Sequence, residues 1–306
     1  VKPNCRVVLV GDSNQLPAVG PGNILKDLID SNIVPCVMLT EIFRQSQPSQ
    51  IVVNAHNINN GIAPVSAGKD SDFFFIDADG DRAEELLVQF VTARLPQAYG
   101  YDSYDDIQVL CPSRKKRGGT ANINVVLQKS LNPPAANKRE ISFNGVIFRE
   151  CDKVMQIKNN YQLEWEVVSR YGIPIDKGLG IFNGDVGRIL EIREGISELV
   201  VEYDEGRRVT YPFALLEELE LSYAVTIHKS QGSEYPAVIM PLLTGPRMLF
   251  NRNLLYTGVT RAKNCVTILG SSETVRGMIA NESENKRYTS LKVRIQELKE
   301  IMKDGI

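Results

Sequence analysis

Leu221-Ser-Tyr-Ala-Val-Thr-Ile-His-Lys-Ser-Gln-Gly-Ser-Glu-Tyr235 combines an apolar, β-type segment with the polar loop that follows it. The segment delivers Thr226, His228 and Lys229 into a loop that ends at Glu234. Alternation along a strand would place Thr226 and His228 on one face and Ile227 on the other. Hydroxyl, imidazole and ammonium groups gathered in this way suit the binding of a polyanion.

Two further polar loops follow apolar runs. Gly11-Asp-Ser-Asn-Gln-Leu-Pro17 comes after Val7-Val-Leu-Val10, and the second loop is Tyr256-Thr-Gly-Val-Thr-Arg-Ala-Lys263. The run that begins at Val7 has the length of a strand. Its polar edge is of the kind that carries ligand groups in parallel α/β sheets. Together, the three loops indicate a motor protein.

These segments resemble the motor motifs of superfamily 1 DNA helicases, specifically the RecD-like group that includes the exodeoxyribonuclease V alpha subunit. The matching segments are Gly11–Gly22 for motif III, Leu39–Gln45 for motif IV, Val225–Glu234 for motif V and Leu254–Lys263 for motif VI. The resemblance covers nearly the whole chain. It implies a RecA-like parallel sheet of the P-loop NTPase type, ATP and Mg²⁺ as cofactors, single-stranded DNA as partner, and helicase-nuclease subunits as further partners.

Two motifs of that group do not occur in the chain. There is no Gly-x-x-x-x-Gly-Lys-Ser/Thr, the loop that wraps the β- and γ-phosphates, and no acidic Mg²⁺-binding motif. In RecD-like proteins both precede motif III, so we expect a C-terminal piece whose partner is the N-terminal RecA-like lobe. Residues 1–47 would end the first lobe, and 48–144 with 217–306 would form the second. Alone, such a piece is expected to turn over little or no ATP.

The segment 145–216 differs from its surroundings in its predicted secondary structure. Around it, the pattern predicts helices over 51–58 and 82–95 and strands over 73–76, 107–111, 237–243 and 266–270. Alternating strands and helices predict a parallel sheet. Within 145–216, short β-rich runs are separated by the turn pairs Asn183-Gly184 and Glu205-Gly206, which predicts a small antiparallel barrel. The segment resembles the SH3-like insertion of RecD-like helicases.

Two local features complete the expected fold. Leu291, Ile295, Leu298 and Met302 form an apolar stripe on a terminal helix, which we expect to pack on the sheet rather than to bind a partner. Cys151 stands before Asp152 where the family pattern has glycine, so the turn at this point departs from that pattern.

Three residues are candidates for a catalytic role at the γ-phosphate of ATP. The transition state spreads negative charge over the phosphate oxygens, and an arginine finger is worth about 10³ to 10⁵ in rate. Arg44 and Arg261 are the candidate fingers. Gln15 has an amide suited to orienting water, and Asp12 would help to hold Mg²⁺ indirectly. The alternatives are salt-bridged surface arginines and a loop amide that caps a turn.

The resemblance to motif V assigns contacts to the loop after Val225. Thr226 and His228 would contact single-stranded DNA, and Lys229 would bind a phosphate. The other two residues are assigned to the nucleotide cofactor: Gly232 allows close approach of the backbone, and Glu234 would accept a hydrogen bond from the ribose hydroxyl. A purely structural histidine is the alternative for His228.

A separate basic loop follows the strand predicted over 107–111. Arg114, Lys115, Lys116 and Arg117 precede Gly118-Gly119, and Thr120 is a candidate N-cap for the next helix. Four cations at a helix N-terminus attract phosphate. The spacing is not that of a Walker loop, so we assign the four to the DNA backbone rather than to ATP. A solvated charged loop is the alternative.

Composition limits the other classes of function. The 35 Lys and Arg residues are balanced by 37 Asp and Glu, so binding of nucleic acid must come from local clusters. Five widely spaced cysteines without C-x-x-C spacing, and only two histidines, favour reduced core thiols and no zinc site. No apolar run approaches the roughly 20 residues of a membrane span, so we expect no membrane partner and a cytoplasmic protein.

We therefore expect the motor portion of an ATP-dependent DNA helicase, with 5′ to 3′ movement implied by the family alone. A second hypothesis is a non-catalytic module that binds DNA or assembles a complex through the β-rich insertion. An exposed apolar face on that insertion, together with a blocked motif V groove, would favour it. A third is a DNA-stimulated ATPase that never unwinds a duplex, and only a strand-displacement assay separates it from a helicase.

Overall fold

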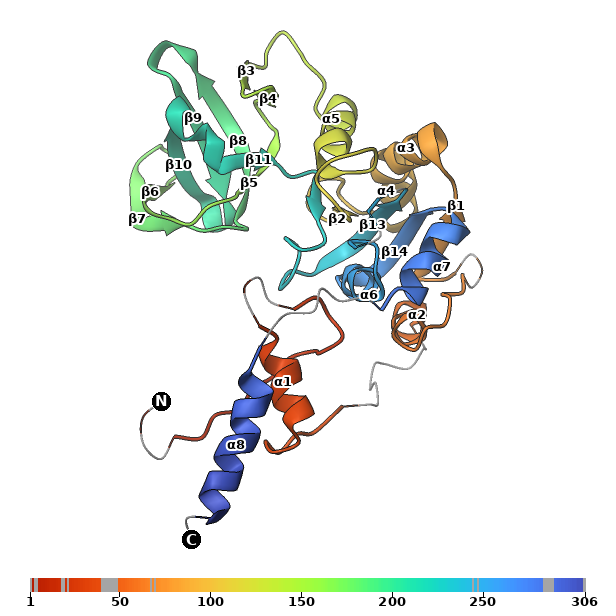
Figure 1. The fold of residues 1–306 in the computed structure, drawn as a ribbon. Helices are drawn as coiled ribbons and strands as arrows, with labels where there is room; N and C mark the ends of the chain where they lie inside the picture. Colours follow the sequence, from red (N-terminus) through yellow and green to blue (C-terminus); the bar gives the residue numbers. More distant parts are fainter. Residues whose placement is uncertain are drawn as a thin grey trace.

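The computed structural model describes residues 2, 5–17, 20, 22–39, 49–66, 68, 70–243, 245–246, 248–282 and 289–304. In this part of the chain, helices surround one sheet, and a second sheet lies beside them (Figure 1). Arg44 and the rest of the expected motif IV segment from residue 40 onward lie outside the described residues. None of the helices described here has both the length and the apolar character needed to cross a membrane.

The first sheet is entirely parallel, with the spatial order β1-β14-β13-β2-β12. Its strands are β1 (Phe73–Asp77), β2 (Ile107–Cys111), β12 (Ala224–Thr226), β13 (Tyr235–Leu242) and β14 (Ala262–Gly270). Both faces are buried: Val109 and Cys111 belong to one apolar core and Leu110 to the other. Strands covered on both faces are apolar throughout, which is why they stand out in the sequence. The expected α/β class is confirmed.

Helices cover both faces of the parallel sheet (Figure 1). One face carries α3 (Gly80–Gln89), α4 (Leu95–Tyr99) and α5 (Thr120–Leu131), and the other carries α2 (Gln50–Asn59), α6 (Arg252–Val259) and α7 (Ser272–Ala280). A π-helical turn over Phe90–Arg94 joins α3 to α4, so the helix expected over 82–95 continues to Tyr99.

The second sheet is antiparallel, with the order β11-β5-β8-β9-β10-β6-β7. Its strands are β5 (Lys153–Gln156), β6 (Asn160–Val168), β7 (Pro174–Ile181), β8 (Val186–Arg193), β9 (Glu198–Tyr203), β10 (Arg207–Pro212) and β11 (Leu219–Leu221). A separate hairpin of β3 (Glu140–Phe143) and β4 (Val146–Arg149) precedes this sheet. Three 3₁₀ turns connect strands within the sheet: Glu194–Ile196, Asp204–Gly206 and Phe213–Glu218. The two expected turns form, with φ of 103° at Gly184 and 71° at Gly206.

In sequence, the second sheet lies between β2 and β12, so it interrupts the parallel sheet. Its hydrogen-bonded strands begin at Lys153 and end at Leu221. The division of the chain at residues 145 and 216 stays a prediction.

Two sequence expectations at the ends of the chain are wrong. Val7–Val10 forms no strand, and its side chains are 58% to 94% exposed, because no neighbouring strand in the described residues pairs with its backbone. The terminal helix α8 (Leu291–Asp304) packs against α1 (Ile24–Ser31), away from both sheets (Figure 1). Both faces of the parallel sheet are already covered, so α8 finds its contact elsewhere.

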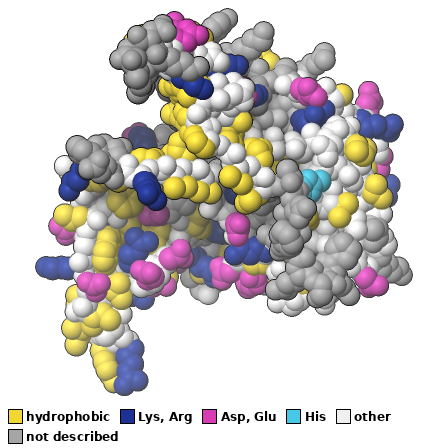
Figure 2. Space-filling view, turned by 90° about the horizontal axis from the view of Figure 1, so that it is seen from below, with side chains coloured by type: hydrophobic (Ala, Val, Ile, Leu, Met, Phe, Trp, Pro, Cys, Tyr) yellow, Lys and Arg dark blue, Asp and Glu magenta, His cyan; other side chains and the backbone are white. Residues whose placement is uncertain are grey.

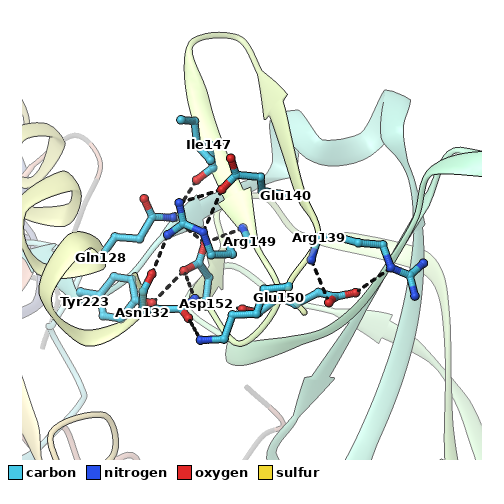
Figure 3. Close-up of polar contacts among 10 residues, drawn as sticks. Gln128, Asn132, Arg139, Glu140, Ile147, Arg149, Glu150, Asp152 and Tyr223 are labelled. Carbon is cyan, nitrogen blue, oxygen red and sulfur yellow. Dashed lines mark hydrogen bonds and ion pairs between the residues drawn. The ribbon is translucent and has the colours of Figure 1, made fainter. Parts of the chain in front are cut away.

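A buried polar cluster around Asp152 joins α5, the β3–β4 hairpin and the segment that leads into β12 (Figure 3). Asp152 Oδ1 accepts hydrogen bonds from Asn132 Nδ2 at 2.7 Å and from the Tyr223 hydroxyl at 2.8 Å. Its Oδ2 accepts from Gln128 Nε2 at 2.6 Å and from the Arg149 backbone N–H at 2.7 Å. Burial raises the pKa of Asp152, and these donors oppose that rise.

The short connection from β11 to β12 is held by further side chains. Asn124 of α5 donates to the Ala224 carbonyl at 3.0 Å and accepts from the Ala224 N–H at 2.8 Å. Gln108 of β2 donates to the Tyr223 carbonyl at 3.1 Å and accepts from Lys153 Nζ of β5 at 3.2 Å. Burial lowers the pKa of Lys153 to about 8. The strand that leads into motif V is therefore fixed to both sheets.

Cys151 adopts the turn that glycine would favour. Its φ is 72°, its N–H donates to the Ile189 carbonyl at 2.8 Å, and its side chain is exposed. The left-handed conformation costs a residue with a Cβ about 1–2 kcal/mol, while glycine loses about 0.5–1 kcal/mol more backbone entropy on folding.

We therefore expect Cys151→Gly to raise the free energy of unfolding by about 0.5–1 kcal/mol in urea titrations. Cys151→Ala is the matched control, because it removes the thiol and keeps the Cβ. Equal stabilisation by both variants would assign the effect to the thiol and not to the backbone.

Candidate functional site

Three segments that are far apart in the sequence, two loops and helix α6, meet at Leu16. The Leu16 N–H donates to Thr257 Oγ1 of α6 at 2.8 Å. The Leu16 carbonyl accepts from Gln231 Nε2, in the loop after β12, at 2.6 Å. Both backbone groups of one residue are thus held by side chains from the segments that resemble motifs V and VI.

Asp12 organises the loop that resembles motif III. Its Oδ1 accepts from the Asn14 N–H at 2.9 Å, and its Oδ2 accepts from Gln15 Nε2 at 3.1 Å and from the Tyr256 hydroxyl at 2.9 Å. Burial and the neighbouring Asp12 charge raise the pKa of Tyr256, which stays a neutral donor. Asp12 therefore fixes the orientation of the Gln15 amide relative to α6.

Arg261 lies at the end of the same network and is only 7% exposed. Its Nε donates to the Thr257 carbonyl at 3.2 Å and its Nη1 to the Ser233 carbonyl at 3.1 Å. Its Nη2 donates to Gln15 Oε1 at 3.1 Å and to Thr260 Oγ1 at 3.3 Å. Since a guanidinium carries five N–H donors, one N–H on Nη1 remains without a partner among the described residues. That donor can serve a bound anion.

The packing of α6 fixes the position of Arg261. The helix begins at Arg252, and the side chain of its N-cap, Asn251, accepts from the Leu254 N–H at 2.9 Å. Gly258 allows α6 to lie close to β13, because a Cβ at this position would collide with Met240. The N-cap at Asn251 and the close packing at Gly258 thus fix α6 on β13, and Arg261 follows directly after this helix.

The strand before motif V ends two residues earlier than the predicted alternation requires. β12 ends at Thr226, and the chain then turns, with the Ser230 N–H donating to the Thr226 carbonyl at 3.1 Å. Thr226 Oγ1 accepts from the Lys229 N–H at 3.3 Å. The prediction that alternation carries His228 onto the face of Thr226 is therefore wrong, because the strand no longer continues there. Partial desolvation of the His228 ring lowers its pKa, although the residue as a whole is exposed.

Gly232 and Glu234 form the exposed end of that loop. Gly232 has a φ of 85°, a conformation that glycine adopts without steric cost. Glu234 Oε2 lies 3.6 Å from Lys263 Nζ, and both side chains are 54% exposed. The two residues lie next to Ser233, whose carbonyl accepts from Arg261.

Backbone hydrogen bonds join the two ends of the basic loop that contains Arg114 to Arg117. The N-cap of α5 is Gly119 and not Thr120, so that expectation is wrong. The Thr120 N–H donates to the Ser113 carbonyl at 3.0 Å, and the Ala121 N–H donates to the Arg114 carbonyl at 3.1 Å. Two of the N–H groups that begin the helix are therefore already satisfied within the loop, and a phosphate here would depend on the side-chain cations.

Those four cations fall into two groups. Arg114 Nη2 lies 2.6 Å from Glu220 Oε1, and Arg117 pairs with Asp81 and Glu84. Lys115 and Lys116 are exposed and form no ion pair within the described residues. Figure 2 shows the face seen from below, where the coloured Lys and Arg side chains alternate with Asp and Glu. Attraction for a polyanion is therefore local, as the balanced composition predicts.

Several residues of these networks were missed by the sequence analysis. They are Tyr256, Thr257, Gln231, Ser233 and Glu220. The first four lie inside segments already identified as motifs, so their positions were in view, but their partners depend on contacts between distant loops. Glu220 directly precedes the apolar run that begins at Leu221 and gave no signal of its own.

The residues present fit part of an ATP site. Arg261 offers an N–H that no described residue accepts, and Gln15 offers an amide that is already oriented. Both carboxylate oxygens of Asp12 accept hydrogen bonds from protein donors, and its indirect role at Mg²⁺ stays a prediction. Within the part of the chain that the structure describes, no group of three or more His, Cys, Asp or Glu residues is arranged to hold a metal ion.

Comparison with family models agrees with this arrangement. The model described as the ATP-dependent RecD-like DNA helicase SH3 domain matches residues 123–203, and the UvrD-like helicase C-terminal domain matches residues 221–269. An AAA domain model matches residues 1–74. The first match covers most of the second sheet, and the second covers β12, β13, α6 and nearly all of β14.

Curated relatives match almost the whole chain. An ATP-dependent RecD2 DNA helicase of Deinococcus radiodurans is 34% identical over 97% of this chain and 37% of that protein. A RecBCD enzyme subunit RecD of Mycolicibacterium smegmatis is 27% identical over 97% of this chain and 50% of that protein. The chain thus spans half or less of the length of these relatives.

Among solved structures, a Pif1 helicase from Bacteroides in complex with ADP-AlF3 and ssDNA covers 95% of this chain and 66% of that chain, with a TM-score of 0.47 and 18% identity. That similarity is too weak to support a conclusion about this chain. The helicase family models and the curated relatives agree with each other and with the motif segments that meet at Leu16. Over nearly its whole length, the chain is similar to RecD-like DNA helicases.

Proposed function

We propose that this chain is the motor portion of an ATP-dependent DNA helicase that moves along single-stranded DNA, in the 5′ to 3′ direction. The observation that carries the proposal is the meeting of three motif segments at Leu16. The relative in Deinococcus radiodurans, named as an ATP-dependent DNA helicase, supports it.

In this proposal, Arg261 and Gln15 act together at the γ-phosphate of ATP. Arg261 donates its remaining N–H to a phosphate oxygen, where negative charge develops in the transition state. Gln15 keeps its amide in place through Asp12 and orients the attacking water. Both residues already contact each other at 3.1 Å, so they can bind the same group.

The same network offers a route from nucleotide to DNA. Gln231 holds Leu16 and lies in the loop that carries His228 and Lys229. A shift of the Gln15 loop on hydrolysis therefore displaces the loop that would contact DNA. We propose that this contact couples ATP turnover to movement.

The chain contains no Gly-x-x-x-x-Gly-Lys-Ser/Thr loop, so the phosphates must be held by a segment outside these 306 residues. We propose that the chain alone turns over little ATP. Activity is expected in the assembled motor, by which we mean this chain joined to a nucleotide-binding lobe with a Walker loop.

The test is ATP hydrolysis with and without single-stranded DNA, measured for the chain alone and for the assembled motor. The proposal expects DNA-stimulated turnover in the assembled motor only. Strand displacement on duplexes with a 5′ or a 3′ tail then tests unwinding and direction. Stimulated hydrolysis without displacement would leave a DNA-dependent ATPase, and no stimulation by DNA would reject the motor.

DNA binding is expected to depend on Lys115 and Lys116, the two lysines of the basic loop that pair with no described carboxylate. Replacing both Lys115 and Lys116 with Gln should reduce the slope of log affinity against log salt by about 1.4, because each phosphate neutralised on a single strand contributes about 0.7. Arg117→Gln is the control, since Arg117 is held by Asp81 and Glu84. An equal change in both variants would argue against a specific phosphate contact.

A second function is favoured by one observation on the second sheet. Exposed apolar side chains gather on β6, β7 and the turn between them, each 62% to 73% exposed: Tyr161, Tyr171, Ile173, Ile175 and Leu179. Such a face suits a module that assembles with other subunits. Replacing Ile175 and Leu179 with Ser should leave DNA-stimulated hydrolysis intact if the face serves assembly only.

A further inference from the structure

Glu220 lies between the two parts of the candidate DNA site. Its Oε1 is 2.6 Å from Arg114 Nη2, in the basic loop, and its Oε2 is 2.8 Å from Lys229 Nζ, in the loop after β12. One carboxylate therefore holds a cation from each loop. Both cations were expected to bind DNA phosphates.

The sheet topology explains why these cations meet. β2 and β12 are neighbouring parallel strands, with Cys111 opposite Thr226. Their carboxyl ends therefore open at the same edge of the sheet, and the loops that follow bring Arg114 and Lys229 together. Glu220 comes from β11 of the other sheet and reaches that edge from the side.

The charges around Glu220 favour its replacement by another anion over a permanent ion pair with Arg114 and Lys229. Two cations and one carboxylate leave a net charge of +1, so the cluster still attracts an anion. The Arg114 side chain is 67% exposed and that of Lys229 is 33% exposed. The Glu220 side chain between them is 24% exposed, and ion pairs between partly exposed side chains are weak enough for a second anion to compete. A DNA phosphate carries the same charge as the carboxylate and offers the same kind of oxygen acceptor to a guanidinium and an ammonium.

We propose that Glu220 is an internal substitute for a DNA phosphate: it holds Arg114 and Lys229 together in the DNA-free protein and is displaced by a backbone phosphate of single-stranded DNA. The inference rests on the proposed function, since it assumes that the chain binds single-stranded DNA. In this inference, Glu220 limits the affinity of the DNA site. It also keeps Arg114 and Lys229 at a spacing that fits one phosphate.

The test compares Glu220→Gln with Glu217→Gln by fluorescence anisotropy of a labelled oligothymidylate over a salt series. Glu217 is a matched control, because it also forms an ion pair, with Lys158 at 2.6 Å, and its loss changes the net charge equally. E220Q should bind about tenfold more tightly than the wild type at low salt, with a slope steeper by about 0.7. E217Q should stay within about twofold of the wild type.

A second comparison has a first arm in the wild-type background, which does not depend on the folding of E220Q. In the wild-type background, Arg114→Gln should cost less affinity than Lys115→Gln, because Arg114 must first leave Glu220. In the E220Q background, the cost of Arg114→Gln should rise to match that of Lys115→Gln. Equal costs in the wild type, or an E220Q affinity no higher than that of E217Q, would overturn the inference.

Weaker binding by E220Q would also overturn it, since that result would make the carboxylate a required support for the two cations. If the wild-type chain binds no single-stranded DNA at any salt concentration, the proposed function and this inference both fail. Binding by the wild type with no difference between E220Q and E217Q rejects the inference alone.

Discussion

Arg261→Ala is expected to lower the maximal ATP turnover of the assembled motor by about 10³-fold or more, with a much smaller change in the KM for ATP. The reason is that the guanidinium would act on charge that develops in the transition state, so its loss affects kcat more than ground-state binding. Steady-state hydrolysis over a range of ATP concentrations, at saturating single-stranded DNA, provides the measurement.

Arg252→Ala is the matched control for this prediction. Arg252 is the first residue of α6, whereas Arg261 follows the end of that helix; Arg252 is also largely buried, but it donates to the carbonyls of Ile279 and Asn59 and pairs with Glu282. Its loss removes a structural contact at the far end of the helix. Equal losses of turnover in both variants, with equal losses of thermal stability, would mean that Arg261 acts only by holding α6 in place.

The second large effect is expected at Asp152. Asp152→Ala removes the acceptor of four hydrogen bonds, from Asn132, Tyr223, Gln128 and the Arg149 backbone. Each buried donor left without a partner costs about 1–3 kcal/mol, so the free energy of unfolding should fall by at least about 3 kcal/mol. A typical domain has only about 5–15 kcal/mol in total.

Urea titration followed by circular dichroism gives the size of this loss. Asp102→Ala serves as the control, because Asp102 also accepts two backbone hydrogen bonds, from Tyr104 and Asp105, but in an exposed loop. It should change the free energy of unfolding by less than about 1 kcal/mol. A loss of similar size in both variants would show that burial of the Asp152 cluster contributes little.

The parts of the fold that were predicted correctly are those whose pattern is local. β2 was found because strands covered on both faces are apolar throughout, and the turns at Gly184 and Gly206 follow from residues that allow a positive φ. The strand expected over Val7–Val10 did not form, since a strand depends on a neighbour that the sequence pattern does not specify. The contact of α8 with α1 depends in the same way on which surfaces are already covered.

In the candidate site, too, the residues that belong to local motifs were predicted, and the contacts between distant segments were not. Gln15 and Arg261 were identified separately from their motifs, and the structure places them 3.1 Å apart. The expectation for His228 assumed that a strand continues past Thr226, but the chain turns there. The pairing of Arg114 with Glu220 crosses between the two sheets, and no local pattern of charges predicts it.

The position of the second sheet between β2 and β12 also has a consequence for the order of folding. Gln108 and Tyr223 contact each other although they are 115 residues apart in sequence. Bringing two such distant points together carries an entropy cost that grows with the length of the intervening chain. The antiparallel strands from Lys153 to Leu221 are joined mostly by short turns, so they can form first and draw the two points closer. We therefore expect the insertion to act as a folding template, with the β2–β12 edge of the parallel sheet closing only after it is in place.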